Sequence, residues 1–256
     1  MKRVLLVLAV LIVVPVLAIG GALFKAFGGN RPLVDGVELP GGARLVKDGI
    51  VAAYVLPAGD SAVALIDCGN DPTGGRLIAE LTRRGLGPDA VKAIFLTHAH
   101  GDHIAGCHLF PKADIMAFEG DVGLAAGTAR AKGPLTQFMS TAPERRITVT
   151  RVLKDGEDVT VGPLTVKAYA APGHTGGSAV YFSGGTLYFG DSANGASDGT
   201  LKPAPWLFSD DGAQNAASLE AVARRVKADG LTVQTMTFAH SGPFDGVSAL
   251  EDFRGQ

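Results

Sequence analysis

The sequence contains no block of Lys and Arg, and its charges nearly balance, with 23 basic and 25 acidic residues among 256. This absence argues against nucleic-acid binding, which needs clustered cations. No internal period is visible, so a repeat architecture is not expected. Apolar residues make up 46% of the chain, enough for a substantial core of one large or two small domains. The 35 glycines indicate many turns and favour a sheet-rich protein over a helical bundle.

Cysteine is scarce, since Cys68 and Cys107 are the only two, and they lack the Cys-x-x-Cys spacing of a metal or redox pair. Two interpretations are open. The pair forms a disulfide if the domain lies in an oxidising compartment. Otherwise each cysteine is a small buried apolar side chain, which is the common role of an isolated cysteine.

Charge is also absent from residues 4–24, which follow the basic start Met1-Lys2-Arg3. This run is long enough to cross a bilayer as a helix, and the same plan is found in secretory signals. We expect residues 1–26 to be a membrane anchor, or a cleaved signal segment, and residues 27–42 to be a linker. The domain of residues 43–256 is then expected on the periplasmic side of a bacterial inner membrane, or secreted.

Beyond position 43, apolar and alternating runs predict a sequence of strands and helices. Strands are expected at residues 50–56, 62–66, 91–96, 115–118, 159–161, 164–169, 179–182, 186–189 and 233–239. Helical spacing occurs at residues 77–81 and 219–226. Because strands and a helix occur twice in succession, the pattern predicts an α/β protein with two β-rich halves and helices outside, an αββα sandwich.

The segment from His98 to His103 places three imidazoles and a carboxylate directly after a predicted strand. An extended backbone points His98 and His100 to one side. The glycine that follows lets the chain turn, so that Asp102 and His103 face a second point nearby. Neutral imidazole and carboxylate are ligands that zinc prefers. Two such points predict a two-metal site.

Three further residues of metal-ligand type, His174, Asp191 and His240, follow predicted strands and stand close to glycines. A single histidine in such a place is more often a helix cap or a satisfied polar group. Five of the six histidines at strand-to-loop junctions are harder to explain in that way, because α/β sheets place their sites at these ends. The sixth, His108, is interpreted as a surface residue.

These motifs resemble those of the metallo-β-lactamase-fold hydrolases. The resemblance rests on His-x-His-x-Asp-His at 98–103, Pro-Gly-His-Thr at 172–175 and Gly-Asp-Ser at 190–192, and it runs from about Ala43 to His240. It implies two zinc ions per chain, although another divalent metal would also suit these ligands. The implied ligands are His98, His100 and His174 for one ion, Asp102, His103 and His240 for the other, and Asp191 as a bridge. It also implies that Asp67 supports the site, whereas a plain turn residue is the alternative.

Two positions indicate which branch of this superfamily the chain resembles. Asp191 stands where the true β-lactamases have Cys or Ser, which is similar to the glyoxalase II, lactonase and phosphodiesterase branch. His100 stands where the flavodiiron proteins use Glu. The chain ends 16 residues after His240, so the C-terminal domain with which glyoxalase II grips glutathione is not expected.

The expected function is a dinuclear zinc hydrolase in which a metal-bridging hydroxide cleaves an ester, lactone or thioester. Asp102 is the expected catalytic residue, since besides binding metal it can orient the hydroxide and pass on a proton. One alternative is a phosphodiester or β-lactam hydrolase. Another is a non-catalytic metal-binding protein of the same fold, although structural zinc sites are usually closed by four ligands.

The substrate is expected to be a small molecule, whose identity the sequence leaves open together with the oligomeric state. Residues 192–215, which carry Trp206 and Phe208, are the first candidate for the wall of a substrate pocket. Residues 119–146 are the second, because a long segment without a clear element is often functional. The alternative is that Trp206 and Phe208 only pin their loop to the core.

Overall fold

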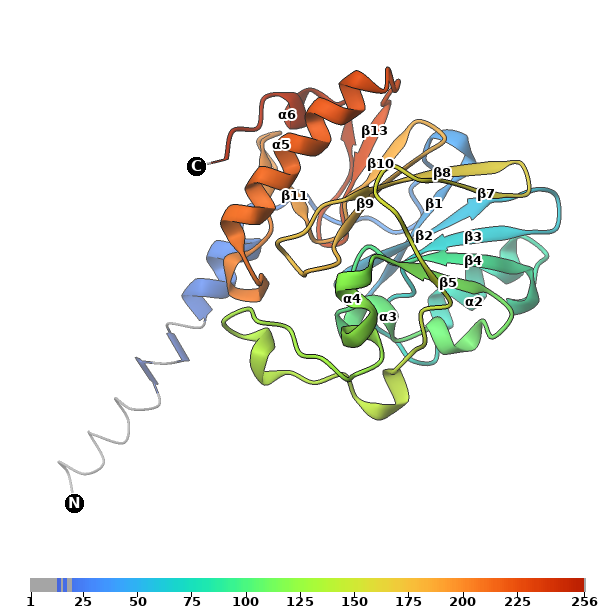
Figure 1. Ribbon diagram of the computed structural model, residues 1–256, viewed down its shortest axis with the longest axis horizontal. Coiled ribbons are helices and arrows are strands. Elements are labelled where there is room, and N and C mark those ends of the chain that lie inside the picture. Colours follow the sequence, from blue (N-terminus) through green and yellow to red (C-terminus); the bar gives the residue numbers. More distant parts are fainter. Residues whose placement is uncertain (1–12, 15, 18–19, 256) are drawn as a thin grey trace.

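The computed structural model describes residues 13–14, 16–17 and 20–255, and two facing six-stranded sheets form its centre (Figure 1). The first sheet consists of β1 (Arg44–Asp48), β2 (Val51–Pro57), β3 (Val63–Ile66), β4 (Val91–Phe95), β5 (Asp114–Ala117) and β6 (Arg151–Val152), in this order. The second consists of β14 (Phe244–Asp245), β13 (Thr235–Thr237), β10 (Thr186–Tyr188), β9 (Ala179–Ser183), β8 (Leu164–Ala170) and β7 (Asp158–Val161), in this order.

Helices cover the outer face of each sheet (Figure 1). The first sheet carries α2 (Gly75–Arg83), α3 (Gly101–Ile104) and α4 (Glu119–Ala125), and the second carries α5 (Gly212–Ala228) and α6 (Ser248–Glu251). A short ribbon of β11 (Ala193–Gly195) and β12 (Leu201–Pro203) stands apart from both sheets. The fold is therefore the αββα sandwich that the order of strands and helices predicts.

The core follows from the period of two along each strand. In β2, Tyr54 and Leu56 point between the sheets, whereas Ala53 and Val55 point toward the helices on the outer face. On the other outer face, the 17-residue helix α5 buries Leu219, among others, against the second sheet. Three apolar layers thus hold four layers of structure together, and the ends of the strands are rigid supports for side chains.

The N-terminal segment packs against the domain before β1 begins. Residues 20–27 are helical, and the ammonium of Lys202 donates to the carbonyls of Ala26 and Gly28, which lie 3.1 and 3.2 Å away at the end of this helix. Asn30 forms a bridge with Ala196, and Leu39 is buried in the layer between the sheets. The segment predicted as a linker is thus in contact with the folded domain along its length.

The membrane helix expected at residues 4–24 falls largely on positions 1–12, 15, 18 and 19, which lie outside the described residues. Among the residues that the structure does describe, no helix is both long enough and apolar enough to cross a membrane. The expected anchor thus stays a prediction.

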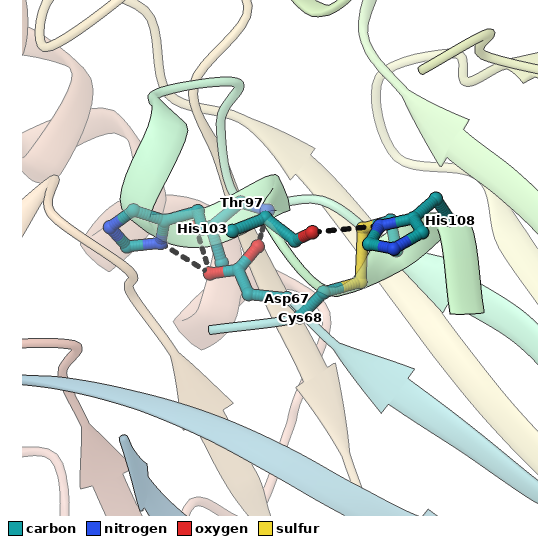
Figure 2. The surroundings of a disulfide bond; sticks show 7 residues. Asp67, Cys68, Thr97, His103 and His108 are labelled. Atoms are coloured by element: carbon teal, nitrogen blue, oxygen red, sulfur yellow. Dashed lines mark hydrogen bonds and ion pairs between the residues drawn. A yellow bond between two sulfur atoms is a disulfide. The ribbon is translucent and has the colours of Figure 1, made fainter. Parts of the chain in front are cut away.

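Cys68 and Cys107 form a disulfide with their Cα atoms 5.2 Å apart, so the first of the two interpretations holds (Figure 2). The bond joins the end of β3 to the short turn that follows α3. The backbone N–H of Cys68 also donates to the carbonyl of His103 at 2.7 Å. The segment that follows β3 is therefore linked to the histidine motif by a hydrogen bond and to the turn after this motif by a covalent bond.

Candidate metal centre

The seven side chains predicted as metal ligands come together at one edge of the sandwich. His98, His100, Asp102 and His103 follow β4, His174 follows β8, Asp191 follows β10 and His240 follows β13. Both sheets therefore contribute to the cluster, because the carboxyl ends of these four strands meet at the same edge. Ligand atoms of His98, His100 and His174 form one compact group, and those of Asp102, His103 and His240 form another.

The first triad presents three ring nitrogens to a common point. Nε2 of His98, Nδ1 of His100 and Nε2 of His174 lie 3.1 to 3.2 Å from one another. Ligands at 2.0–2.1 Å from a tetrahedral zinc ion are roughly 3.3 Å apart, so the spacing fits that ion. Burial lowers the pKa of His98 well below its usual value and that of His174 to about 3. These imidazoles are therefore neutral at pH 7, as a ligand must be.

The second triad lies in a more negative environment. Oδ2 of Asp102 is 3.5 Å from Nε2 of His240 and 3.8 Å from Nε2 of His103. Burial opposes a charge on His103, but the carboxylates of Asp102 and Asp191 outweigh it and raise its pKa well above the usual value. Burial is outweighed at His240 too, where Asp191 and Asp102 raise the pKa to about 10. The carboxylates thus favour a cation at this point.

Asp191 stands between the triads. Its Oδ1 is 3.2 Å from Nε2 of His240 and 3.4 Å from Nε2 of His103, and its Oδ2 is 3.6 Å from Nε2 of His174. Among the described residues, Oδ1 of Asp191 and Nε2 of His103 are buried without a hydrogen-bond partner. Leaving such atoms unpaired costs about 1–3 kcal/mol each. Unpaired nitrogen and oxygen atoms that face one point fit a bound metal ion.

Hydrogen bonds on the far side of four imidazoles fix which nitrogen faces the cluster. In each, Nδ1 has a protein partner 2.8 to 3.2 Å away that can accept its proton, which leaves Nε2 to face the cluster as the ligand atom. The pairs are His98 with the Thr97 hydroxyl, His103 with the Asp67 carboxylate, His174 with the Ser209 hydroxyl and His240 with the Ile50 carbonyl. His100 differs, since its Nδ1 faces the first triad.

Asp67 ties β3 to the histidine motif, as Figure 2 shows. Its carboxylate accepts the backbone N–H of Thr97 at 2.7 Å, the Thr97 hydroxyl at 2.6 Å and Nδ1–H of His103 at 2.8 Å. Its φ of 58° lies in the left-handed region that favours glycine, which costs of order 1–3 kcal/mol. The three hydrogen bonds hold this conformation, so Asp67 has the supporting role that the resemblance implies.

Asp121, at the start of α4, is a residue that the sequence interpretation missed. Its Oδ2 accepts the backbone N–H of Ala99 at 2.7 Å and the Thr175 hydroxyl at 2.9 Å, and its Oδ1 accepts the N–H of Gly177 at 2.9 Å. Burial, only partly offset by these donors, raises its pKa to about 6. One fully buried carboxylate therefore joins the loop of His98 and His100 to the loop of His174.

A pocket of about 700 Å³ opens over the cluster. His100, Asp102, Asp191 and His240 form its floor. The remaining lining residues are Leu23, Phe27, Ile50, Asn70, Ala99, Gly101, Leu124, Ala129, Ala131, Thr136, Met139, Ser140, Thr141, Ala142, Arg145 and Phe208. The size is typical of small-molecule sites.

The two segments predicted as pocket walls contribute unequally. Residues 119–146, the second candidate, supply most of the wall, whereas residues 192–215 supply Phe208. The prediction for Trp206 was wrong, because this side chain is 53% exposed and does not line the pocket. The wall residues Leu23 and Phe27, which precede the expected domain, had no signal in the sequence beyond an apolar helix.

Comparison with known proteins matches residues 46–235 to the model of the metallo-beta-lactamase superfamily. A hydroxyacylglutathione hydrolase of Citrobacter koseri is 34% identical over 101 residues, 40% of this chain and 33% of that protein. An uncharacterized protein of Bacillus subtilis, YobT, is 36% identical over 107 residues, 39% of this chain and 45% of that protein. The matched region thus spans less than half the length of these curated relatives.

Among solved structures, a B3 metallo-beta-lactamase with an active-site glutamic acid superimposes with a TM-score of 0.64. The superposition covers 91% of this chain and 90% of the other, at 22% sequence identity. At this identity the likeness concerns the fold.

Proposed function

Because this chain belongs to the metallo-β-lactamase superfamily of metal-dependent hydrolases, we propose that it cleaves an ester, lactone or thioester of a small molecule at a pair of zinc ions. The observation that carries the proposal is the position of Asp191, whose carboxylate lies between two groups of three ligands at the floor of a pocket. A closed structural zinc site has no need of a second triad or of an open pocket.

The donor set supports a place for each of two ions. His98, His100 and His174 would hold one, Asp102, His103 and His240 the other, and Asp191 would contact both. When bound, a pair of such ions supplies an acidified water as nucleophile at neutral pH and polarises a carbonyl oxygen. Asp67 and Asp121 keep the ligand loops in place through the hydrogen bonds described above.

Asp102 has the properties of a proton acceptor. Its side chain is 32% exposed and lines the pocket, so a substrate or a water molecule can reach it. Burial raises its pKa, but His103 and His240 outweigh this effect and hold the pKa below its usual value. The carboxylate is therefore ionised at neutral pH and can accept a proton from the attacking water and deliver it to the leaving group.

The wall of the pocket favours a carboxylic ester, thioester or lactone over a phosphodiester. Arg145 is the one Lys or Arg side chain among the described residues that line it. A phosphodiester carries a negative charge and is usually bound by several cations or polar donors. A neutral acyl compound needs no such partners, and it gains from the apolar walls.

A substrate panel on the zinc-loaded full-length protein tests the proposal. Chromogenic esters, lactones, thioesters, phosphodiesters and a cephalosporin would be compared, with the chelator-stripped protein as the matched control. We expect zinc-dependent turnover of an ester, lactone or thioester. Preferred turnover of the phosphodiester or the cephalosporin would show that the substrate is a phosphodiester or a β-lactam instead of an ester, lactone or thioester. Two bound zinc ions without any turnover would favour the non-catalytic alternative.

We also propose that the domain lies outside the cytoplasm, anchored through residues 4–24 or released after cleavage. The disulfide between Cys68 and Cys107 supports this location, because disulfides persist in oxidising compartments. The test is expression in a bacterium, followed by membrane fractionation and protease treatment of spheroplasts. We expect the protease to digest the domain in intact spheroplasts, or the cleaved domain to be released into the medium when the spheroplasts are prepared. Full protection would place it in the cytoplasm.

A further inference from the structure

The N-terminal helix forms part of the wall of the pocket. Leu23 and Phe27, both on the helical residues 20–27, line the same cavity as His100 and His240. In Figure 1, this helix, in blue, leaves the domain at the end where the green and yellow loop also lies. The segment that precedes the hydrolase domain thus reaches the floor residues of the site.

Phe27 is held in place from several sides. Its ring centroid is 5.6 Å from that of His240, edge to face, and 5.8 Å from that of Phe208. Lys202 caps the end of the helix through the carbonyls of Ala26 and Gly28. These contacts hold the ring of Phe27 beside a floor histidine, where it lines the pocket.

Another part of the lining is also apolar, beside polar side chains of the same pocket such as Thr136 and Arg145. It is made by Leu124, Ala129, Ala131 and Met139 from the long segment after β5, with Ile50 from the turn between β1 and β2. None of these apolar side chains carries a hydrogen-bond donor. An apolar passage that ends at a cluster of metal-binding side chains suits a molecule with a hydrocarbon chain on one side of a reactive carbonyl.

We propose that Leu23 and Phe27 are specificity-determining residues, and that the pocket binds a linear apolar chain attached to the bond that is cleaved. This inference rests on the proposed function. Water adds to the carbonyl carbon, the bond from this carbon to the leaving oxygen or sulfur breaks, and the products are a carboxylate, a proton and an alcohol or thiol. The chain itself takes no part in the bond changes and acts only through burial.

A chain-length series tests this inference on the zinc-loaded full-length protein at one constant detergent concentration. The substrates are 4-nitrophenyl esters from acetate to decanoate and γ-lactones with alkyl substituents from methyl to hexyl. We expect kcat/KM to rise about two- to four-fold for each methylene that enters the pocket. A flat profile in both series would overturn the proposal and leave the proposed function standing.

Variants of the N-terminal helix test whether the effect of chain length on kcat/KM comes from Phe27. Phe27→Ala is expected to lower kcat/KM for the octanoate ester at least ~10-fold and to change that for acetate less than ~3-fold. Phe27→Leu, which keeps an apolar wall, should recover most of the loss. Phe24→Ala is the matched control, because Phe24 lies on the same helix, is 78% exposed and does not line the pocket. Equal losses for both esters, or the same loss in Phe24→Ala, would contradict the assignment.

A binding measurement separates this inference from the proposed function. Calorimetry would compare decanoate with acetate as ligands of the zinc-loaded protein and of Phe27→Ala. Tighter binding of decanoate that is lost in Phe27→Ala is expected even if no tested ester is hydrolysed. Failure of turnover alone therefore counts against the proposed function, whereas equal affinity for both acids counts against the chain-binding wall.

Discussion

The floor of the pocket is built from side chains at the ends of β-strands, whereas its walls come from the helix of residues 20–27 and the segment after β5. The histidines beneath this floor, His98, His103 and His174, are buried, and Nδ1 of each ring has a hydrogen-bond partner. The rim is exposed, with Ile50 at 71% and Met139 at 58%. The difference suggests that the floor sets the reaction and the walls set the substrate.

The largest effect on stability is expected from the disulfide, which links the end of β3 to the turn after the histidine motif. Cys68 and Cys107 close a loop with a sequence separation of 39. Replacing both by Ser should lower the free energy of unfolding by about 4 kcal/mol, from the loop entropy of the unfolded chain. Urea unfolding of the oxidised protein and of the double variant measures this. Equal stabilities would mean that the disulfide does not hold the end of β3 to the histidine motif.

The buried carboxylate of Asp121, which holds the ligand loops together, should make the free energy of unfolding depend on pH. Burial raises the pKa of Asp121 to about 6 from 3.8. The folded protein therefore keeps a proton that the unfolded chain loses, so this contribution is complete below about pH 4 and is lost as the pH rises through about 6. A shift of two pKa units corresponds to about 3 kcal/mol.

Asp121→Asn cannot titrate and provides the reference. The unfolding free energy of the wild type minus that of the variant, both stripped of metal, should fall by about 3 kcal/mol between pH 4 and pH 7. The subtraction cancels the contribution of histidine titration to the unfolding free energy, because both proteins contain the same histidines. A difference that is constant over this range would show that Asp121 is already ionised at pH 4.

Removal of the exposed carboxylate of the floor should affect the reaction and not the fold. Asp102→Ala is expected to lower kcat at least ~100-fold, the scale of losing one proton-transfer or electrostatic element. The variant should still fold, which circular dichroism checks, because the side chain is 32% exposed and lies outside the apolar core. Unchanged turnover would remove Asp102 from the mechanism.

The smallest effect on stability is expected in the wall. Met139→Ser should change the free energy of unfolding by less than ~0.5 kcal/mol, because an exposed side chain away from the core contributes little. It should still lower kcat/KM several-fold for long-chain esters, since Met139 lines the pocket. A large loss of stability would mean that the wall is as tightly held as the floor.

The difference between the floor, built at strand ends, and the walls, built from loops and a helix, explains which residues could be predicted from the sequence. His98, His174, Asp191 and His240 follow predicted strands, and the ends of these strands, one from the first sheet and three from the second, meet at one edge of the sandwich. Residue type and position were therefore enough to propose the cluster. The sandwich was predictable for a related reason, because β2 is a continuous apolar run and β8 alternates apolar with polar residues along most of its length.

The missed residues depend on contacts that no local pattern records. Asp121 resembles any acidic residue in the first turn of a helix, and its partners Ala99 and Gly177 are distant in sequence. Phe27 is the first residue of the segment predicted as a linker, although its ring packs on His240. Trp206 was a candidate for the wall because it lies in the loop of residues 192–215, with the pinning of that loop as the alternative, and it is half exposed.

The number of zinc ions bound per chain tests the central claim most directly. Full-length protein, stripped with a chelator, dialysed against zinc and analysed by mass spectrometry, is expected to hold two ions per chain. Asp191→Ala, which removes the carboxylate between the triads, is expected to hold fewer than two under the same conditions. A wild-type protein that retains less than one zinc ion per chain would contradict the account.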